Sequence, residues 1–575
     1  MADQPQRQYP LCSWHLRGFR SIRDDTTFEF SGLNLLVGAN SAGKSSVLHS
    51  LLMVAQTLGN PLADRPLVLN GSLVRLGLAE DTIHQESHHS ITIGFALTPA
   101  SPLAQLRARY LNEFTRLDVR ATFAMEHGGT DFGTSEVDVR ASAHDPEPRT
   151  QRLAVAGRSK TAARAAFREA GLRGKSVDHA TKLLSYSAAG DIPTRSAGVR
   201  LRQFLPEQLL VVANTYEEEL ELLRWPYLRY GAAVDQARFR RARQRPISRP
   251  VLNFMASFLQ EEYGSDVAAA IPRTGEMTIE ALAEHLPGPA WQELQSLAST
   301  DWFAQHRGHL RFNGELQVAD LPDVIGAGVD YARRWFQGSV RHLGPLRAAP
   351  QPLYNLPEAA SGTSVGPDGE YTAAVLSAHA RRLVLAPDPT GQQPREIPLG
   401  QAVDEWMSAL GLLATVRSQE RGKLGYELHL RMEGVGRDLD LTTVGVGVSQ
   451  ALPIVVLGLI SQPGGLLLFE QPELHLHPDV QAALGDFFLA LAQTGRQLIV
   501  ETHSEYLINR LRRRAATSPE LNTEDIVRLF FFERAGSTAT VRPARIGAGG
   551  SMSDWPRGFL DTAVREVQAI ARASK

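Results

Sequence analysis

The residues that most constrain this chain form a short glycine-containing loop near its N-terminus. Residues 38–45 read GANSAGKS and fit the pattern G-x-x-x-x-G-K-S/T. An apolar run at 33–37 precedes the loop, and apolar residues recur at helical spacing over 45–58. Strand, glycine loop and helix in this order form the context in which the pattern binds phosphate groups. The sequence therefore predicts a P-loop between a buried strand and a helix.

The chemistry of phosphate binding explains why these residue types occur at this spacing. Two glycines let the backbone curl, so that several N–H groups point inward at phosphate oxygens. The following helix directs its positive N-terminal end at the same anion. We expect Lys44 to reach the β- and γ-phosphates of ATP and the Ser45 hydroxyl to ligate Mg²⁺. The predicted nucleotide-binding residues of the loop are Gly38, Ala39, Asn40, Ser41, Ala42, Gly43, Lys44, Ser45 and Ser46.

A P-loop also needs an acidic residue at the end of a second strand to hold Mg²⁺ and its water. The apolar run at 464–469 ends in Glu470, which we predict as the metal-side residue together with Ser45. Gln471 stands where the general base is usually found, and an amide does not accept a proton at neutral pH. Three interpretations stay open: Gln471 only orients water, Glu473 is the base, or hydrolysis is slow.

Histidines follow this strand and the next one. His475 and His477 could share a strand face and bind a metal, but Pro478 favours a loop without a metal. A second buried strand at 497–500 leads within three residues to His503. A histidine in that place is well positioned to contact the γ-phosphate, and the alternative is a helix cap built from the hydroxyls beside it. We predict the γ-phosphate role.

Apolar strands that alternate with helices predict an α/β fold with a mainly parallel sheet covered on both faces. The 575 residues favour several domains. The two nucleotide motifs, however, lie at opposite ends of the chain, so we predict one head split by a large, mainly helical insertion. The expected divisions are 1–94 for the N-terminal half of the head, 95–340 for the insertion, 341–520 for the C-terminal half and 521–575 for a small C-terminal domain.

Composition narrows the possible functions. The net charge is −2, so a site for a polyanion must be a local patch. The one cysteine, Cys12, excludes an intramolecular disulfide framework and a zinc site with several cysteines. The N-terminal residues have no apolar signal-peptide core, and the longest apolar run, 451–460, is too short to span a bilayer. We expect a soluble, cytoplasmic protein that does not bind membranes.

Four segments, GANSAGKSS, the Gly/Ser/Gln stretch at 445–450, LLLFEQPELHLHP and ETHS, resemble in this order the ABC-type ATPase heads of the SMC, RecF and OLD-like group. More closely, the chain resembles a bacterial family of AAA-type ATPases with a C-terminal domain of unknown function. The resemblance covers about 10–90 and 340–575, and it implies a P-loop NTPase of the ABC/SMC-head type, with helices on both faces of a mixed sheet. Further segments similar to the family pattern are 343–347 (LGPLR), 365–370, 444–453 and 554–559 (DWPRGF).

The resemblance also implies a site shared by two protomers. In such heads two copies sandwich two ATP molecules, and a signature segment of one copy touches the γ-phosphate held by the other. Here that segment corresponds to the start of the helix near 445–450, where backbone N–H groups and the helix dipole would meet the phosphate. Asp479 resembles the residue that lines the dimer interface. The signature candidates are Gly445, Gly447, Ser449 and Gln450, with Gly447 and Ser449 favoured.

The distances between motifs along the sequence distinguish this chain from several classes of related ATPase. The stretch between Lys44 and Glu470 is too long for a transporter subunit and lacks the sustained heptads of an SMC coiled coil. The residues after His503 contain no acidic cluster suited to a two-metal nuclease. We therefore predict an ATPase that acts as a switch or motor, forms a homo-dimer or higher oligomer, and works with a separately encoded, nuclease-like effector.

The resemblance leads to one expectation about function, and Gln471 leads to an alternative. Members of the resembled family often lie in loci for anti-phage defence or DNA maintenance, so we expect this chain to act in such a setting. The alternative is a low-turnover ATP-binding scaffold that oligomerises and holds its effector inactive. Gln471, which replaces the usual Glu, motivates this alternative.

An arginine-rich stretch in the predicted insertion is the candidate nucleic-acid contact. Guanidinium groups neutralise phosphates, and Phe239 could stack on a base. The alternative is a solvated helix face in a chain that is rich in arginine throughout. The candidate residues are Arg238, Arg240, Arg241, Arg243, Arg245 and Arg249.

Overall fold

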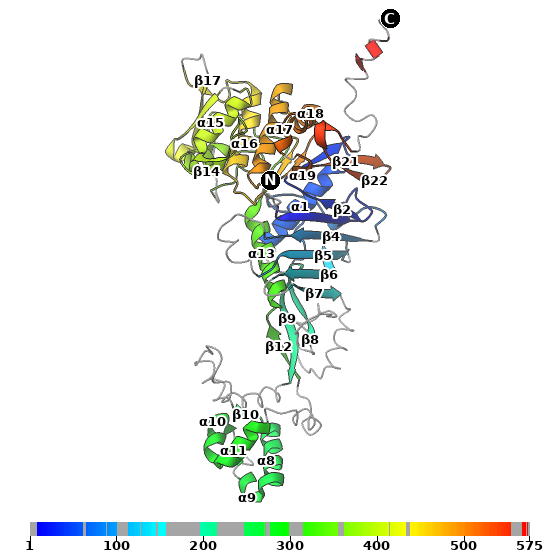
Figure 1. Cartoon of the computed structure of the whole chain (residues 1–575), viewed down its shortest axis with the longest axis vertical. Helices are drawn as coiled ribbons and strands as arrows, with labels where there is room; N and C mark the ends of the chain where they lie inside the picture. The colour runs from blue at the N-terminus through cyan, green and yellow to red at the C-terminus, as the bar shows by residue number, and fades with distance from the viewer. Residues whose placement is uncertain are drawn as a thin grey trace.

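Figure 1 shows the computed structural model of the chain, an elongated molecule with the phosphate loop in its upper part. The candidate nucleic-acid residues before 246 and the motif at 554–559 lie outside the residues that the structure describes. The structure describes residues 9–60, 65–87, 89–99, 113–126, 128–144, 148–156, 196–214, 246–269, 271, 277–297, 314–354, 362–412, 414–432, 437–521, 523–553, 566–567, 569–570 and 572.

The phosphate loop belongs to a six-stranded sheet, called here the P-loop sheet, with strand order β13-β19-β20-β3-β21-β22. The first five strands are parallel, and β22 is antiparallel to β21. The predicted strands at 33–37, 464–469 and 497–500 are confirmed as neighbours in one sheet. The strands span Val340–Leu343 (β13), Leu466–Glu470 (β19), Gln497–Glu501 (β20), Leu33–Gly38 (β3), Val527–Ala535 (β21) and Thr538–Ala544 (β22).

Both faces of the P-loop sheet are buried, as the apolar runs predict. Because side chains alternate along a strand, Leu466 and Leu468 enter one core while Leu467 and Phe469 enter the other. The first core contains α1 (Lys44–Gly59) and α13 (Asp323–Ser339). The second contains α14 (Thr372–His379), α15 (Leu399–Ala409), α16 (Val446–Ile460), α17 (Pro478–Gln493) and α18 (Glu505–Thr517).

Helix α16 differs in one respect from its sequence prediction. The apolar run at 450–460 predicts a buried helix with Pro453 in its first turn, but the helix begins at Val446. Pro453 therefore lies inside the helix, where it has no N–H to donate to the preceding turn.

A second sheet, called here the N-terminal sheet, is antiparallel throughout and has the order β2-β1-β4-β5-β6-β7. The segments 14–22 and 27–30 predict a hairpin-like start, which is confirmed because β1 pairs with β2. The expected boundary at 94/95 is wrong, since it cuts through β4. The strands span Thr26–Glu29 (β2), Leu11–Arg17 (β1), Ser90–Leu97 (β4), Arg116–Met125 (β5), Phe132–Ala143 (β6) and Arg149–Ala156 (β7).

The expectation of a mainly helical insertion is wrong for 116–156 and 196–214. In β5 every second residue is buried from Leu117 to Phe123, which is the period of a half-buried strand and not of a helix. A smaller sheet follows with order β12-β9-β8. Its strands span Gly314–Ala319 (β12), Leu205–Asn214 (β9) and Ser196–Arg202 (β8).

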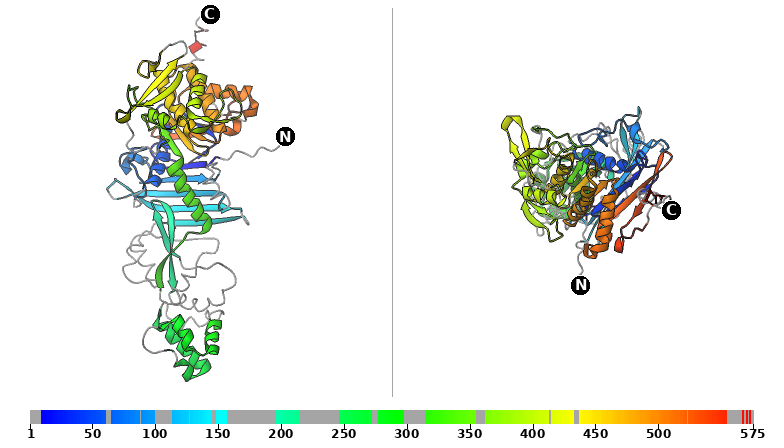
Figure 2. Two further views of the ribbon diagram at one scale, coloured as in Figure 1. Left: turned by 90° about the vertical axis from the view of Figure 1, so that its left-hand side faces the viewer. Right: turned by 90° about the horizontal axis from the view of Figure 1, so that it is seen from above.

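Helices do form the far end of the insertion, in green at the bottom of Figure 1. They share a small core of their own, separate from the two cores at the P-loop sheet. Helix α13 then leads back toward β13 and packs against β5, β6 and β7 (Figure 2). The helices span Arg249–Tyr263 (α8), Ser265–Ala268 (α9), Ile279–His285 (α10) and Gly288–Leu297 (α11).

The expected separate C-terminal domain at 521–575 is also wrong for its described residues up to 553. Strand β21 (VRLFFFERA) pairs in parallel with β3, the strand that enters the phosphate loop. Its apolar residues fill both cores of the P-loop sheet. Within the described residues, no helix is long and apolar enough to cross a membrane.

Candidate active site

The phosphate loop joins β3 to α1 through two glycines with positive φ. Gly38 has φ 145° and Gly43 has φ 104°. A Cβ on Gly38 would lie 2.3 Å from the carbonyl oxygen of Phe532, and one on Gly43 would lie 2.3 Å from Ser21 Oγ. Both the backbone conformation and the close packing therefore require glycine at these positions.

Lys44 is buried at the start of α1, with 3 % of its surface exposed. Its ammonium donates to the carbonyl oxygens of Gly38 at 3.1 Å and Ala39 at 2.8 Å. Burial lowers the pKa of Lys44, and the charges of Glu501 and Glu473 oppose that shift. The ammonium lies over the loop that it is predicted to complete, where it can bind a phosphate.

Ser45 contacts a carboxylate that the sequence analysis did not single out. Its hydroxyl lies 3.1 Å and 2.9 Å from the two carboxylate oxygens of Glu501, the last residue of β20. Glu501 is in register with Glu470 on the neighbouring strand β19. The signal was present in the sequence, because Glu501 ends a buried strand in the same way as Glu470.

The charge state of Glu501 depends strongly on its surroundings. Burial raises its pKa to about 7; the charges of Glu470 and Glu473 also raise it, while Ser45 and Lys44 lower it. Hydroxyl and carboxylate oxygens are the ligands that Mg²⁺ prefers, so Ser45 and Glu501 fit this ion.

A cavity of about 250 Å³ lies at the phosphate loop. Its wall combines the loop backbone, the Lys44 ammonium, a second cation and one carboxylate, which is the composition expected for a Mg²⁺–phosphate complex. The residues that line it are Arg20, Ser21, Ser41, Ala42, Gly43, Lys44, Ser45, Ser46 and Glu501.

Glu470, the predicted metal-side residue, is held by a histidine from the adjacent strand. His342 Nε2 lies 2.8 Å from Glu470 Oε1. Burial raises the pKa of Glu470, but the hydrogen bond to His342 and the charges of His342, His49 and Arg347 together outweigh it, so the pKa is lowered. Glu470 is therefore an ionised carboxylate one strand away from the carboxylate that contacts Ser45.

Glu473, one of the candidate bases, lies next to the His503 loop. Thr502 Oγ1 donates to one of its carboxylate oxygens at 2.9 Å, and the backbone N–H of His503 donates to the other at 2.6 Å. Burial raises the pKa of Glu473, and these hydrogen bonds and Lys44 oppose the shift. A carboxylate that is fixed in place and has a raised pKa suits proton transfer.

His503 presents a free ring nitrogen. Its Nε2 is buried and has no hydrogen-bond partner among the described residues. Burial and the charge of Lys44 lower its pKa. Ser504 caps α18 by accepting from Leu507 N, so the alternative of a helix cap holds for Ser504 but leaves His503 available.

Gln471 and His477, which follow β19, each take part in a hydrogen bond with the backbone. Gln471 has a positive φ of 43°, and its backbone N–H donates to the carbonyl of Glu501 at 2.8 Å. His477 caps α17 by accepting from the N–H of Asp479, and the Asp479 side chain is 95 % exposed. No cluster of three metal-ligating side chains occurs among the described residues.

The signature candidates divide into an exposed and a buried pair. Gly445 caps α16 and is exposed, and Gly447 is half-buried. Ser449 and Gln450 are buried, and the Ser449 hydroxyl donates to the carbonyl of Val446 at 2.7 Å. Ser449, one of the two favoured contacts, is therefore turned into its own helix, and the accessible backbone is that of 445–447.

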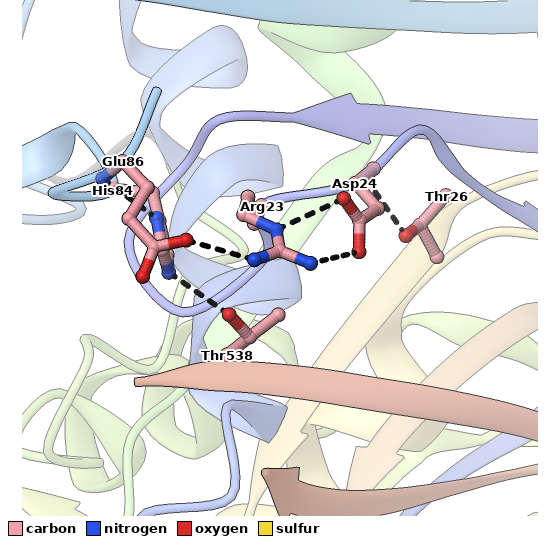
Figure 3. A network of polar contacts seen from close by, with 6 residues as sticks. All are labelled: Arg23, Asp24, Thr26, His84, Glu86 and Thr538. Carbon is pink, nitrogen blue, oxygen red and sulfur yellow. Dashed lines mark hydrogen bonds and ion pairs between the residues drawn. The ribbon is translucent and has the colours of Figure 1, made fainter. Parts of the chain in front are cut away.

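The loop after β1 adds Arg20 and Ser21 to the cavity and is fixed by polar contacts. Arg23 bridges Asp24 and Glu86, and His84 links the N–H of Glu86 to the Thr538 hydroxyl on β22 (Figure 3). Because His84 Nδ1 accepts from a backbone N–H, its Nε2 carries the proton that is donated to Thr538.

Parts of the chain match three family models. An AAA domain matches 14–67, an AAA ATPase domain matches 401–508, and a family described only as a protein of unknown function matches 523–570. The first two matches contain the phosphate loop and the carboxylates Glu470, Glu473 and Glu501. The chain has a P-loop ATPase fold. This assignment supports ATP binding and hydrolysis, with Mg²⁺ as the usual companion of the nucleotide.

Comparison with whole proteins adds little. No curated protein matches the chain. The Smc head domain of Pyrococcus furiosus, solved with an extended coiled coil and bound to the C-terminal domain of ScpA, is 10% identical with a TM-score of 0.33, covering 98% of this chain and 100% of that one. The SMC head domain of Thermotoga maritima is 9% identical with a TM-score of 0.31, covering 93% and 98%. These scores are low, so the fold assignment rests on the sheet order, the phosphate loop and the AAA matches.

Proposed function

We propose that this protein is an ATP-driven switch whose heads associate when ATP binds and separate after hydrolysis. The observation that supports it best is the arrangement around Ser45. The phosphate loop, the Ser45 hydroxyl and three buried carboxylates, Glu470, Glu473 and Glu501, meet at the carboxyl ends of β3, β19 and β20. This is the edge at which open α/β sheets bind their ligands.

Each residue then has a defined task in the proposed reaction. Lys44 leaves the carbonyls of Gly38 and Ala39 and binds the β- and γ-phosphates. Ser45 and Glu501, with Glu470 beside them, would hold Mg²⁺, which would offset the negative charge of the phosphates. Glu473 accepts a proton from the attacking water.

We propose that His503 contacts the γ-phosphate through Nε2. Its lowered pKa favours the neutral ring, which donates one hydrogen bond from Nε2 when that nitrogen carries the proton. The second copy of the chain would supply the exposed backbone at 445–447, and Asp479 would lie at the same interface.

The proposal extends to a partner. The resemblance to ATPases that work beside a separate effector supports a role in which this switch controls a nuclease-like protein in anti-phage defence or DNA maintenance. Co-purification of the chain with the product of the neighbouring reading frame, with ATP and with ADP, tests this role. An association that does not depend on the nucleotide would contradict it.

Nucleic acid is the proposed ligand of the insertion, through Arg238, Arg240, Arg241, Arg243, Arg245 and Arg249. Of these only Arg249, at the start of α8, lies within the described residues. Filter binding of duplex DNA to a variant with Arg240, Arg241 and Arg243 changed to Ala tests the stretch. An unchanged affinity with an unchanged salt dependence would exclude it.

The second candidate function is a low-turnover scaffold that binds ATP, oligomerises and holds an effector inactive. Gln471 favours it, because an amide stands where the base is usually found. Steady-state ATP hydrolysis, measured with and without duplex DNA, separates the two candidates. The switch predicts turnover that is absent in Lys44→Ala. No turnover in either condition, together with retained ATP binding, would support the scaffold.

A further inference from the structure

An arginine on the loop after β13 has two buried nitrogens that no described residue satisfies. Arg347 closes the LGPLR segment at 343–347. Its Nε and Nη1 are buried and have no hydrogen-bond partner among the described residues. Burial lowers the pKa of Arg347 to about 10, and the charges of Glu470, Asp368 and Glu473 oppose that shift. A buried charge without a partner is destabilising, so such groups are rare in folded proteins.

Of the three carboxylates near Arg347, Asp368 belongs to an exposed residue and the other two are engaged elsewhere. Glu470 is bound by His342, and Glu473 accepts from Thr502 and from the backbone of His503. The guanidinium nitrogens therefore face an anionic region of the protein without being satisfied by it.

The backbone around Arg347 is fixed by a neighbouring turn. Gly344 N donates to the carbonyl of Pro367 at 2.7 Å, and Ala348 N donates to that of Asp368 at 2.8 Å. Gly369, with φ 74°, closes this turn, and a Cβ there would lie 2.7 Å from Pro453 Cβ on α16. The loop is therefore tied on both sides of Arg347, which limits how far its backbone can move to bring the guanidinium to another partner.

We propose that Arg347 is a ligand of the terminal phosphate of bound ATP. The inference rests on the proposed function and names one more residue of the same site. Strand β13 pairs in parallel with β19, and Leu343 is in register with Phe469, so the loop that carries Arg347 leaves the sheet at the same edge as Glu470. A γ-phosphate bound by Lys44 would lie at this edge too. The planar guanidinium fork suits phosphate oxygens, and its two unused donors are available for them.

The test compares two buried arginines. Arg333 on α13 has its pKa lowered to about 10 by burial, as Arg347 does, but it donates to Gln203 Oε1 and to the carbonyls of Arg202 and Leu205. Arg347→Met and Arg333→Met are measured in the full chain for melting temperature and, with Mg²⁺, for affinity to ADP and to a non-hydrolysable imido analogue of ATP.

Opposite results are expected for the two variants. Arg347→Met should melt at the same or a higher temperature than the wild type, because it removes an unpaired buried charge. Its affinity for the ATP analogue should fall about tenfold or more, while its affinity for ADP changes less than about twofold. Arg333→Met should melt at a lower temperature and keep the wild-type ratio of the two affinities.

The contrary outcomes are distinct. An unchanged ratio of affinities in Arg347→Met, or an equal loss for both nucleotides, would overturn the assignment. A large drop in its melting temperature would show that the guanidinium has structural partners, and Arg347→Lys would then decide whether the ratio still depends on this side chain. A wild-type chain that binds neither nucleotide would instead refute the proposed function itself.

Discussion

The Ser45 hydroxyl lies within 3.1 Å of both carboxylate oxygens of Glu501, although the two residues are 456 positions apart. Ser45 is the second residue of α1, and Glu501 is the last residue of β20. The two side chains meet because β20 lies directly beside β3. The contact places a carboxylate beside Ser45, the proposed Mg²⁺ ligand.

Glu501→Gln is expected to reduce the dependence of ATP affinity on Mg²⁺. The amide oxygen still accepts from Ser45, but the neutral side chain attracts a divalent cation less strongly. We expect the gain in affinity between EDTA and Mg²⁺ to shrink about tenfold, which corresponds to about 1.4 kcal/mol. Titration of a fluorescent ATP analogue in both buffers measures it. Glu396→Gln, on the exposed strand β15 (Arg395–Pro398), is the control and should leave the gain unchanged.

Glu473→Gln and Gln471→Glu test which residue is the base. Glu473 is fixed by Thr502 and by the His503 backbone, so its loss should lower steady-state turnover about a hundredfold or more. In Gln471→Glu, steady-state turnover should change by less than about threefold. An unchanged rate in Glu473→Gln, or a strong rise in Gln471→Glu, would move the role of base to position 471.

The surroundings of His49 predict that the protein loses stability as the pH falls. Arg20 Nη1 lies 2.6 Å from His49 Nδ1, which must accept because an arginine only donates. Burial lowers the pKa of His49 to about 4, and Arg20 and His342 add to that shift. A lowered pKa means that the unfolded chain binds the proton first, so the free energy of unfolding falls as the pH drops from about 6.5 to about 4.

Protonation of His49 should lower the free energy of unfolding by at most on the order of 3 kcal/mol. His49→Asn keeps an acceptor near the position of Nδ1 and does not titrate in this range. Denaturant unfolding between pH 4 and pH 7 should give a shallower slope for the variant than for the wild type. Parallel curves would contradict the assigned charge state of His49.

The sequence predicts the parts of this fold that repeat a local pattern. The apolar runs at 33–37, 464–469 and 497–500 mark their strands because strands buried on both faces are continuously apolar. The phosphate loop is recognisable because its chemistry requires glycines at fixed spacing. The strands at 116–156 are missed because every second residue in them is polar, although Gly128-Gly129 is a turn signal between β5 and β6.

Two site residues show what a linear pattern does not contain. The role of Glu501 depends on the order of strands in the sheet, which brings β20 beside β3. The orientation of Ser449 depends on where α16 begins, because a start at Val446 turns this hydroxyl back to the helix. Both facts are properties of the assembled sheet and its helices.

The central claim, that ATP brings two heads together, is tested most directly by measuring mass in solution. Light scattering of Glu473→Gln with Mg²⁺ and ATP should give at least twice the 63.0-kDa mass of one chain, and a smaller mass with ADP. The same mass with ATP and with ADP, at concentrations that saturate the site, would contradict the account.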